Sequence, residues 1–307
     1  MLKFYRDEKM LEFKKLTLAD IPRLRGYFSY TKGRACDNTV GVTFMWRDFF
    51  STEYALYEGC AIFKVNYFGK TAFAFPLGEN VAPALCAIDE YCSNLSIPLV
   101  FSSQTADDVN ALRKHFGSVE VSSERDWFDY IYDPSALANL SGKKYHGQKN
   151  HVNFFKKTFP DYSFEELSDN NLSYALDFYK KNKLPEKKDS ALFLEEQTKI
   201  VEIFENISLY GMSGLVLKKD SDSVCAFCIY EICDDTAYVH IEKADSLVRG
   251  AYQMIVHGLA QKVCNKTKYI NREEDVGDEG LRRAKLSYHP CEFIEKFTVT
   301  VPEKRTV

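Results

Sequence analysis

Hydrophobic positions along the first half of the chain follow the spacing of strands in some segments and of helices in others. Runs in which every second residue is apolar predict strands, and runs with apolar residues three and four apart predict helices. The predicted strands are residues 53–57, 60–66, 71–76, 99–102 and 119–132. The predicted helices are a segment that is capped by Thr17 or Asp20 and runs to Tyr27, and residues 44–50, 82–95 and 106–116.

The second half of the chain shows a similar succession of elements. Between the halves, at residues 134–141, the hydrophobic period lapses and small residues cluster, which favours a domain boundary. We therefore expect an N-terminal domain at residues 1–135 and a C-terminal domain at residues 136–307. In the latter, the predicted strands are 161–167, 210–218, 223–233, 236–242, 269–271 and 291–301, and the predicted helices are 170–181, 192–206, 251–262 and 280–286.

Two copies of one unit explain this repetition most simply. The order of elements in each half matches the α/β (α+β) fold of N-acetyltransferase-like domains, called GNAT-like, in which helices flank a mixed central sheet. In such a domain the splayed sheet leaves a cleft for an acyl donor. We expect two tandem GNAT-like domains, with the donor and acceptor cleft in the C-terminal one. A shared fold does not by itself establish a function.

The composition is that of an ordinary globular protein. Hydrophobic residues make up 45% of the 307 residues and charged residues 27%, close to the usual proportions. No apolar run approaches the roughly 18 residues that span a bilayer, and residues 1–9 lack the apolar core of a signal peptide. We therefore expect a cytoplasmic protein.

The nine cysteines form no regular framework, which is typical of reduced thiols. Cys225 and Cys228 have the C-x-x-C spacing, but they fall within a predicted buried strand, whereas a redox dithiol normally begins a helix. No second pair of ligands completes a zinc site. We expect these two cysteines to pack in the core, and we expect no metal.

A basic segment interrupts the acidic composition of the chain. The formal net charge is −4, yet residues 142–157 contain five lysines and two histidines, and no acidic residue lies between Pro134 and Pro160. A lysine run is often only a solvated helix face. The alternative is a surface that binds phosphates or another polyanion.

A second candidate lies at residues 242–252, between a predicted strand and a predicted helix. An acetyltransferase holds the CoA pyrophosphate there, on consecutive backbone N–H groups of a glycine-rich turn. Here the turn has one glycine, Gly250, preceded by Arg249 and followed by Ala251. The segment could contact an anion through Arg249, or it could be a plain turn.

A third candidate, residues 269–290, combines a short strand, a charged loop and a short helix. Loops at this end of a strand face the usual ligand crevice of α/β proteins. Glu273 and Asp275 could bind an amine, while Arg282 and Lys285 could bind phosphate or carboxylate. The alternative is a salt-bridged loop next to an exposed helix.

Residues 142–155 and 271–290 together resemble the bacterial DUF2156 family, which is similar to the C-terminal domain of phosphatidylglycerol lysyltransferase. Residues 44–50 (Phe-Met-Trp-Arg-Asp-Phe-Phe), 53–55 and 75–78 look like the N-terminal half of that family. The resemblance implies a tandem GNAT-like fold related to the Fem peptidyltransferases, which take an amino acid from aminoacyl-tRNA. It also implies a basic surface that holds lipid or tRNA phosphates.

The sequence departs from the lysyltransferases in two ways. It contains no multi-span membrane domain of the kind that delivers lipid to them, and its motif at residues 271–275 differs from theirs. The resemblance therefore carries the fold and the transferase class to this chain, but not lysyl transfer to a lipid.

We expect an acyltransferase, most simply one that moves an aminoacyl group from tRNA or a similar donor to an amine or hydroxyl. Alternatives are a CoA-dependent N-acetyltransferase and a non-catalytic anion- or nucleic-acid-binding module. Acyl-CoA remains a possible donor, peripheral lipid contact is possible, and no obligate protein partner is indicated. The candidate catalytic residues are His151, Glu242 and Asp275. The candidate binding residues are Lys143, Lys144, His146, Lys149, Asn150, Arg249, Gly250, Asn271, Arg272, Glu273, Arg282, Lys285 and Tyr288. His146 is a second possible general base.

Overall fold

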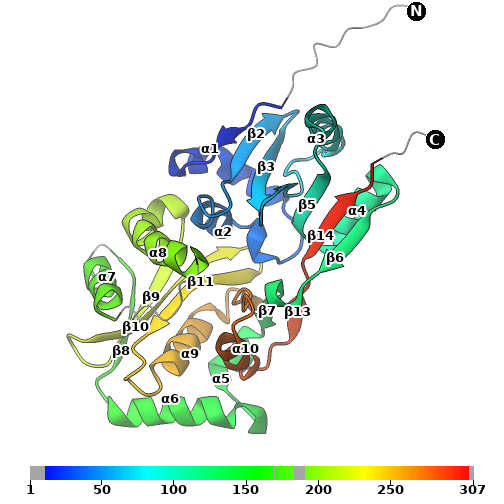
Figure 1. The fold of residues 1–307 in the computed structure, drawn as a ribbon. Coiled ribbons are helices and arrows are strands. Elements are labelled where there is room, and N and C mark those ends of the chain that lie inside the picture. The colour runs from blue at the N-terminus through cyan, green and yellow to red at the C-terminus, as the bar shows by residue number, and fades with distance from the viewer. Residues whose placement is uncertain (1–10, 169, 183–190, 304–307) are drawn as a thin grey trace, which may run out of the picture. The chain divides into compact units, whose positions relative to one another are not determined.

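The computed structural model describes residues 11–168, 170–182 and 191–303, so the expectation for residues 1–9 lies outside the described residues. The chain forms two compact units whose elements are labelled in Figure 1. Unit 1 comprises Met1–Gly33, Trp46–Glu124 and Glu295–Val307, and unit 2 comprises Arg34–Met45 and Arg125–Ile294.

Unit 1 is a mixed sheet with helices. The strand order is β1-β2-β3-β4-β5-β14-β6, with β4 and β5 parallel and the other neighbours antiparallel. Its core includes the buried rings of Phe73 and Phe101, which helices α3 and α4 cover. The strands are β1 (Lys14–Lys15), β2 (Glu53–Tyr57), β3 (Cys60–Tyr67), β4 (Lys70–Phe73), β5 (Leu99–Gln104), β6 (Glu120–Ser123) and β14 (Phe297–Val301). The α-helices are α1 (Ile21–Leu24), α3 (Ala82–Leu95) and α4 (Ala106–Phe116).

Unit 2 has a second mixed sheet, with the order β13-β7-β12-β11-β10-β9-β8, in which β11 and β12 are parallel. Helices α5 and α6 each pack on α9, and α9 contacts β9, β10 and β11, while α7 contacts β10 and α8 (Figure 1). The strands are β7 (Asp129–Tyr132), β8 (Ser163–Glu166), β9 (Ser213–Lys218), β10 (Val224–Cys233), β11 (Thr236–Ala244), β12 (Tyr269–Asn271) and β13 (Glu292–Ile294). The helices are α2 (Val40–Met45), α5 (Pro134–Asn139), α6 (His146–Thr158), α7 (Leu172–Lys181), α8 (Ala191–Tyr210), α9 (Ala251–Val263) and α10 (Glu279–Leu286).

The two sheets repeat one topology and exchange one strand each. In unit 1, β14 from the end of the chain lies between β5 and β6, and in unit 2, β7 lies between β12 and β13. The segments predicted as the single strands 119–132 and 291–301 are therefore each divided, because their two parts pair in different sheets. For the same reason the units differ from the consecutive halves 1–135 and 136–307.

One local prediction is wrong. The aromatic segment 44–50 is not a helix, since helix α2 ends at Met45 and turns follow. The segment 134–141, where the hydrophobic period lapses, contains helix α5, which Asp133 caps by accepting hydrogen bonds from the N–H groups of Ser135 and Ala136. A proline in the first turn and a short polar cap are strong helix signals.

Cys225 and Cys228 lie in β10, and both are buried and free. Burial raises the pKa of Cys225 to about 12, so its thiol stays protonated and packs in the core as predicted. Among the residues that the structure describes, no helix combines the length and the hydrophobicity that crossing a bilayer requires.

Helix α6 packs against the start of α9, and the contact depends on a glycine. Gly250, which precedes α9, has a left-handed φ of 90°, and a Cβ there would lie 2.6 Å from the His151 carbonyl oxygen of α6. A side chain at this position would therefore strain the backbone and separate the two helices.

We expect Gly250→Ala to lower the free energy of unfolding by about 1–3 kcal/mol, because alanine disfavours this φ and overlaps α6. Urea denaturation measures the change. Gly147→Ala, in α6, is the matched control, since apart from its chain neighbours and the backbone of its own helix no atom lies within 4 Å of its Cβ position. The control should be neutral or stabilise by up to about 1 kcal/mol. Equal effects of the two variants would contradict the packing described here.

Candidate functional site

In unit 2, strand β12 pairs with β11 only at the beginning of β11. The last paired residues are Tyr238 and Asn271, after which β11 continues and β12 ends. At the same place β11 has a bulge, because its pairing with β10 skips His240. A bulge changes the direction of a side chain and is frequent beside active sites. The candidate site lies at this end of the pairing.

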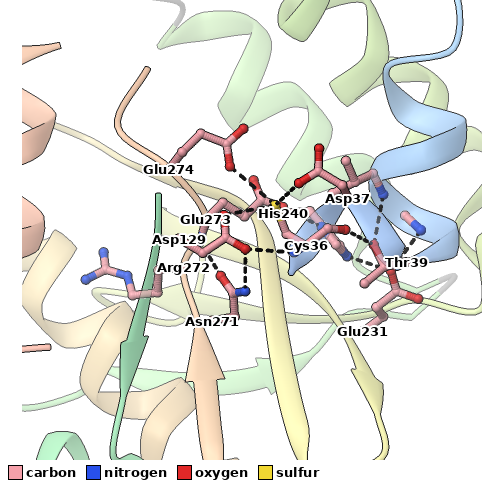
Figure 2. A network of polar contacts seen from close by, with 12 residues as sticks. Cys36, Asp37, Thr39, Asp129, Glu231, His240, Asn271, Arg272, Glu273 and Glu274 are labelled. Atoms are coloured by element: carbon pink, nitrogen blue, oxygen red, sulfur yellow. Dashed lines mark hydrogen bonds and ion pairs between the residues drawn. The ribbon is translucent and has the colours of Figure 1, made fainter. Parts of the chain in front are cut away.

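His240 lies between two glutamates (Figure 2). Its Nε2 is 2.9 Å from Glu231 Oε1, its Nδ1 is 2.7 Å from Glu273 Oε1, and the imidazole is 0% exposed. Burial alone would lower the pKa of His240, but the hydrogen bonds to Glu231 and Glu273 raise it to about 10. The ring is therefore an imidazolium at neutral pH and donates from both nitrogens.

The pKa values of the two glutamates shift in opposite directions. Burial raises the pKa of Glu273. Burial also acts on Glu231, but hydrogen bonds from His240 and from the Gly41 N–H, at 2.8 Å, lower its pKa below the ordinary value. A Cβ on Gly41 would overlap both the imidazole and the Glu231 carboxylate. Position 41, in α2, therefore requires glycine.

Arg272 and Glu242 bridge β11 and the end of β12. Arg272 is the first residue after β12, and its Nη2 donates to Glu242 Oε1 at 2.7 Å. Their side chains are 11% and 14% exposed, so both charges are largely removed from water. The guanidinium also lies over the Tyr132 and Tyr288 rings, with its carbon 5.6 and 4.9 Å from the ring centroids.

The loop 272–278, which follows β12, has unusual backbone conformations. Glu273 and Gly277 have φ values of 58° and 78°, and the left-handed region costs a residue other than glycine about 1 kcal/mol or more. The Lys285 ammonium of α10 donates to the three consecutive carbonyls of residues 272–274, at 2.6, 3.2 and 2.5 Å. Burial lowers the pKa of Lys285. This lysine fixes the path of the loop.

Asp275, in the same loop, is 0% exposed. Arg282 donates to its two carboxylate oxygens at 2.6 and 2.9 Å, and the Tyr130 hydroxyl donates at 2.5 Å. Burial opposes ionisation of Asp275, but these hydrogen bonds hold its pKa below the ordinary value. The carboxylate is thus bound on all sides by groups of the protein.

Cys36, Asp129 and Glu274 form a further cluster (Figure 2). Asp129 accepts hydrogen bonds from the Cys36 N–H at 2.7 Å and from Asn271 Nδ2 at 2.9 Å. The Cys36 sulfur is 3.3 Å from an oxygen of Asp129 and 3.3 Å from one of Glu274. The three donor atoms lie within 4.8 Å of one another, so they could ligate a metal ion such as zinc.

The basic segment forms an exposed surface on a 3-10 helix (Lys143–Tyr145) and on α6. Beside it, the Arg249 guanidinium carbon lies 4.3 Å from the centroid of the Phe154 ring. His151 is partly buried against the turn before α9, and among the described residues its Nδ1 has no hydrogen-bond partner. The predicted binding residues that are exposed on this basic surface are Lys143, Lys144, His146, Lys149 and Asn150.

Some N–H groups of the turn 245–250, and that of the first residue of α9, donate to acceptors within the protein. Asp245 N–H donates to a carbonyl of β10 at 2.8 Å, and Leu247 N–H donates to the Asp245 carboxylate at 2.9 Å. Val248 N–H donates to the Asp245 carbonyl at 3.1 Å, and Ala251 N–H to the Val248 carbonyl at 3.1 Å. These hydrogen bonds leave fewer N–H groups of the turn for a phosphate.

The residues predicted from the sequence fall into two groups in unit 2. At the end of β12 the structure brings together Glu242, Asn271, Arg272, Glu273, Asp275, Arg282, Lys285 and Tyr288. The others lie on the basic surface and at the turn before α9. The charged groups of Asp275, Arg282 and Lys285 bind within the protein, and a contact between them and a donor stays a prediction.

Sequence reasoning missed the residues that depend on long-range contacts: Cys36, Gly41, Asp129, Glu231, His240 and Glu274. One signal was present in the sequence. Glu231 interrupts the apolar run 224–233, and a carboxylate in a buried strand requires a buried partner. That partner is His240.

A family model matches residues 28–300, and its description is phosphatidylglycerol lysyltransferase, C-terminal. The chain belongs to this family. A conserved protein of unknown function from Bacteroides thetaiotaomicron is 29% identical, with a TM-score of 0.85 over 95% of this chain and 100% of that one. The C-terminal domain of a putative lysylphosphatidylglycerol synthetase from Agrobacterium fabrum is 12% identical, with a TM-score of 0.65 over 94% and 93%. The predicted family and tandem GNAT-like fold are confirmed.

An uncharacterized protein from Mycoplasmoides gallisepticum is 23% identical over 174 residues, which are 56% of this chain and 56% of that protein. This chain therefore spans about half the length of the curated relative that it matches. This similarity gives no information about activity.

The pKa of His240 predicts how stability depends on pH. The folded-state pKa of about 10 lies above the ordinary value of 6.5. The stabilisation is therefore complete below pH 6.5 and is lost as the pH rises to about 10. We expect the difference in free energy of unfolding between the wild type and His240→Gln to shrink over that interval, by an amount on the order of a few kcal/mol.

Urea denaturation at a series of pH values measures this difference. The control is His146→Gln, which changes an exposed histidine of α6 and should follow the wild-type profile. A difference between the wild type and His240→Gln that stays constant from pH 6.5 to 10 would show that His240 is not held as an imidazolium.

Proposed function

We propose that this protein is an acyltransferase of the aminoacyl type, which takes an amino acid from tRNA or a similar phosphate-bearing donor to an amine or hydroxyl acceptor. Membership of the phosphatidylglycerol lysyltransferase C-terminal family and the tandem GNAT-like fold support the transferase class. The reaction needs mainly positioning of the two substrates and stabilisation of a tetrahedral oxyanion.

The observation that carries the donor class is the structure of the turn 245–250. The N–H groups of Leu247 and Val248, which a CoA pyrophosphate could otherwise use, donate to Asp245. A pyrophosphate at this turn would also lie near the Asp245 carboxylate. Desolvating a pyrophosphate against a carboxylate is unfavourable. The turn is thus poorly suited to CoA, and the donor requires another place for its phosphates.

The basic surface on α6 supplies such a place. Lys143, Lys144 and Lys149 are exposed, and Arg249 lies beside α6 at the turn. Exposed lysines bind nucleic acid chiefly through phosphates and independently of sequence. In this proposal they hold the donor's phosphates, while its acyl end enters where β11 and β12 stop pairing.

We expect charged tRNA, but not acetyl-CoA, to bind and to raise the melting temperature. The triple variant Lys143→Ala/Lys144→Ala/Lys149→Ala should bind tRNA more weakly. The slope of log Kobs against log salt should also decrease by about 2–3, because each lost phosphate contact changes it by about 0.7–0.9.

Lys14→Ala/Lys70→Ala/Lys114→Ala is the matched control, because it removes three exposed lysines of unit 1 and the same net charge. Stabilisation of the wild type by acetyl-CoA would contradict the proposal in favour of a CoA-dependent N-acetyltransferase. Equal losses in the two triple variants would show that the basic surface on α6 has no special part in binding.

A further inference from the structure

The Arg272 guanidinium is fixed in a buried position at the end of the β11–β12 pairing. Its Nη2 donates to Glu242 at 2.7 Å, and its side chain is 11% exposed. Its backbone is held as well, because its N–H donates to the Tyr130 carbonyl at 3.0 Å and its carbonyl accepts from Lys285 at 2.6 Å. A group held at both ends cannot turn easily toward water.

The other terminal nitrogen of Arg272 is buried without an acceptor. Nη1 is shielded from solvent, and among the described residues no atom accepts a hydrogen bond from it. Leaving a buried donor unsatisfied costs about 1–3 kcal/mol, and more when the group is charged. Native proteins rarely retain such a donor except where a ligand, an ion or water binds.

The surroundings of the Arg272 guanidinium are largely aromatic. The Tyr132 and Tyr288 rings lie beside the guanidinium, and both tyrosines are buried. The Tyr132 hydroxyl is already used, since it donates to the Lys285 carbonyl at 2.8 Å. In Figure 2 the Arg272 side chain points away from the group around His240, so the two sites are separate.

We propose that Arg272 binds the carbonyl oxygen of the donor's acyl group through Nη1 and stabilises the oxyanion that forms during transfer. Glu242 is a positioning residue that orients the guanidinium. This inference rests on the proposed function, because an acyl donor is assumed. The contact is made by Arg272, whose ion-pair partner Glu242 lies 30 positions away in the sequence.

The proposed acyl transfer needs no cofactor. The nitrogen or oxygen of the acceptor attacks the carbonyl carbon, and the π-electron pair moves to the carbonyl oxygen, where Arg272 Nη1–H donates to it. Collapse of this intermediate restores the carbonyl and breaks the ester bond. The departing hydroxyl oxygen takes up the proton that the acceptor loses. A charged donor fixed in a site of low dielectric constant stabilises such an oxyanion more than water does.

A binding experiment isolates the carbonyl contact without an acceptor. The probes are two pairs of amines that differ only in a carboxamide: L-alaninamide with ethylamine, and L-lysinamide with 1,5-diaminopentane. For each protein, calorimetry gives the affinity ratio within a pair. We expect the wild type to prefer the amide of at least one pair by about ten- to hundredfold, as for a hydrogen bond from a charged donor.

The test variant is Arg272→Gln/Glu242→Gln, because removing both charges avoids leaving one of them buried without a partner. Its preference for the amide should disappear, and Arg272→Lys should retain part of it. Arg283→Gln is the matched control, since Arg283 is exposed on α10, and it should keep the wild-type ratio. In ¹⁵N-arginine spectra the Arg272 Nη1 signal should shift with the amide and not with the matching amine.

A wild type that prefers neither amide, including one that binds no probe, overturns the assignment of Arg272, and so does a double variant that keeps the wild-type ratio. The proposed function is tested by a different set of results. Binding of charged tRNA without any amide preference removes only the role of Arg272. An amide preference without tRNA binding supports the Arg272 contact and removes only the tRNA donor.

Discussion

The end of the hydrogen bonding between β11 and β12 is the constraint on which the candidate site depends. Beyond Tyr238 and Asn271 the backbone of each strand needs other partners, because buried N–H and C=O groups are almost always satisfied. The Lys285 ammonium supplies them for three carbonyls of residues 272–274, and Tyr130 of β7 exchanges hydrogen bonds with Arg272 and Glu273. The loop can therefore hold a left-handed Glu273 in a fixed place.

Charged side chains pair with one another beyond the last paired residues of β11 and β12. His240 lies between Glu231 and Glu273, Arg272 binds Glu242, and Arg282 binds Asp275. Buried charges of this kind contribute little net stability compared with apolar residues, but the loss of one partner is costly. The main effect of the network is to hold two groups, the Arg272 guanidinium and the Glu273 carboxyl, in defined orientations.

We propose that donor phosphates bind on the surface of α6 and that acyl transfer occurs at the end of β12, because these two places differ in how their positive charge is exposed. At the end of β12 the cations are bound by carboxylates or carbonyls, whereas the lysines of α6 are open to solvent. The turn 245–250 lies next to α6 through Gly250 but uses several of its N–H groups for hydrogen bonds within the protein. A donor with an extended phosphate backbone matches this arrangement better than one with a single pyrophosphate.

Much of the local structure could be predicted from the sequence, because strand and helix periods are local properties. The spacing of apolar residues gave α9, α10 and most strands of both sheets, and Asn271 to Tyr288 was found as a charged loop and helix. The division of residues 119–132 and 291–301 could not be predicted in this way. Apolar alternation shows that a segment is a strand, but it does not say which strand lies beside it.

The sequence by itself determined the elements, the repeated α/β unit, the single glycine of the turn and the basic surface of α6. Only the tertiary structure decided that β7 and β14 exchange sheets and that His240 meets Glu231 and Glu273. It also decided that Arg272 has one buried nitrogen without an acceptor. The physical reason is that burial and charge pairing depend on residues far apart in the chain, which meet only when the sheet of unit 2 is complete.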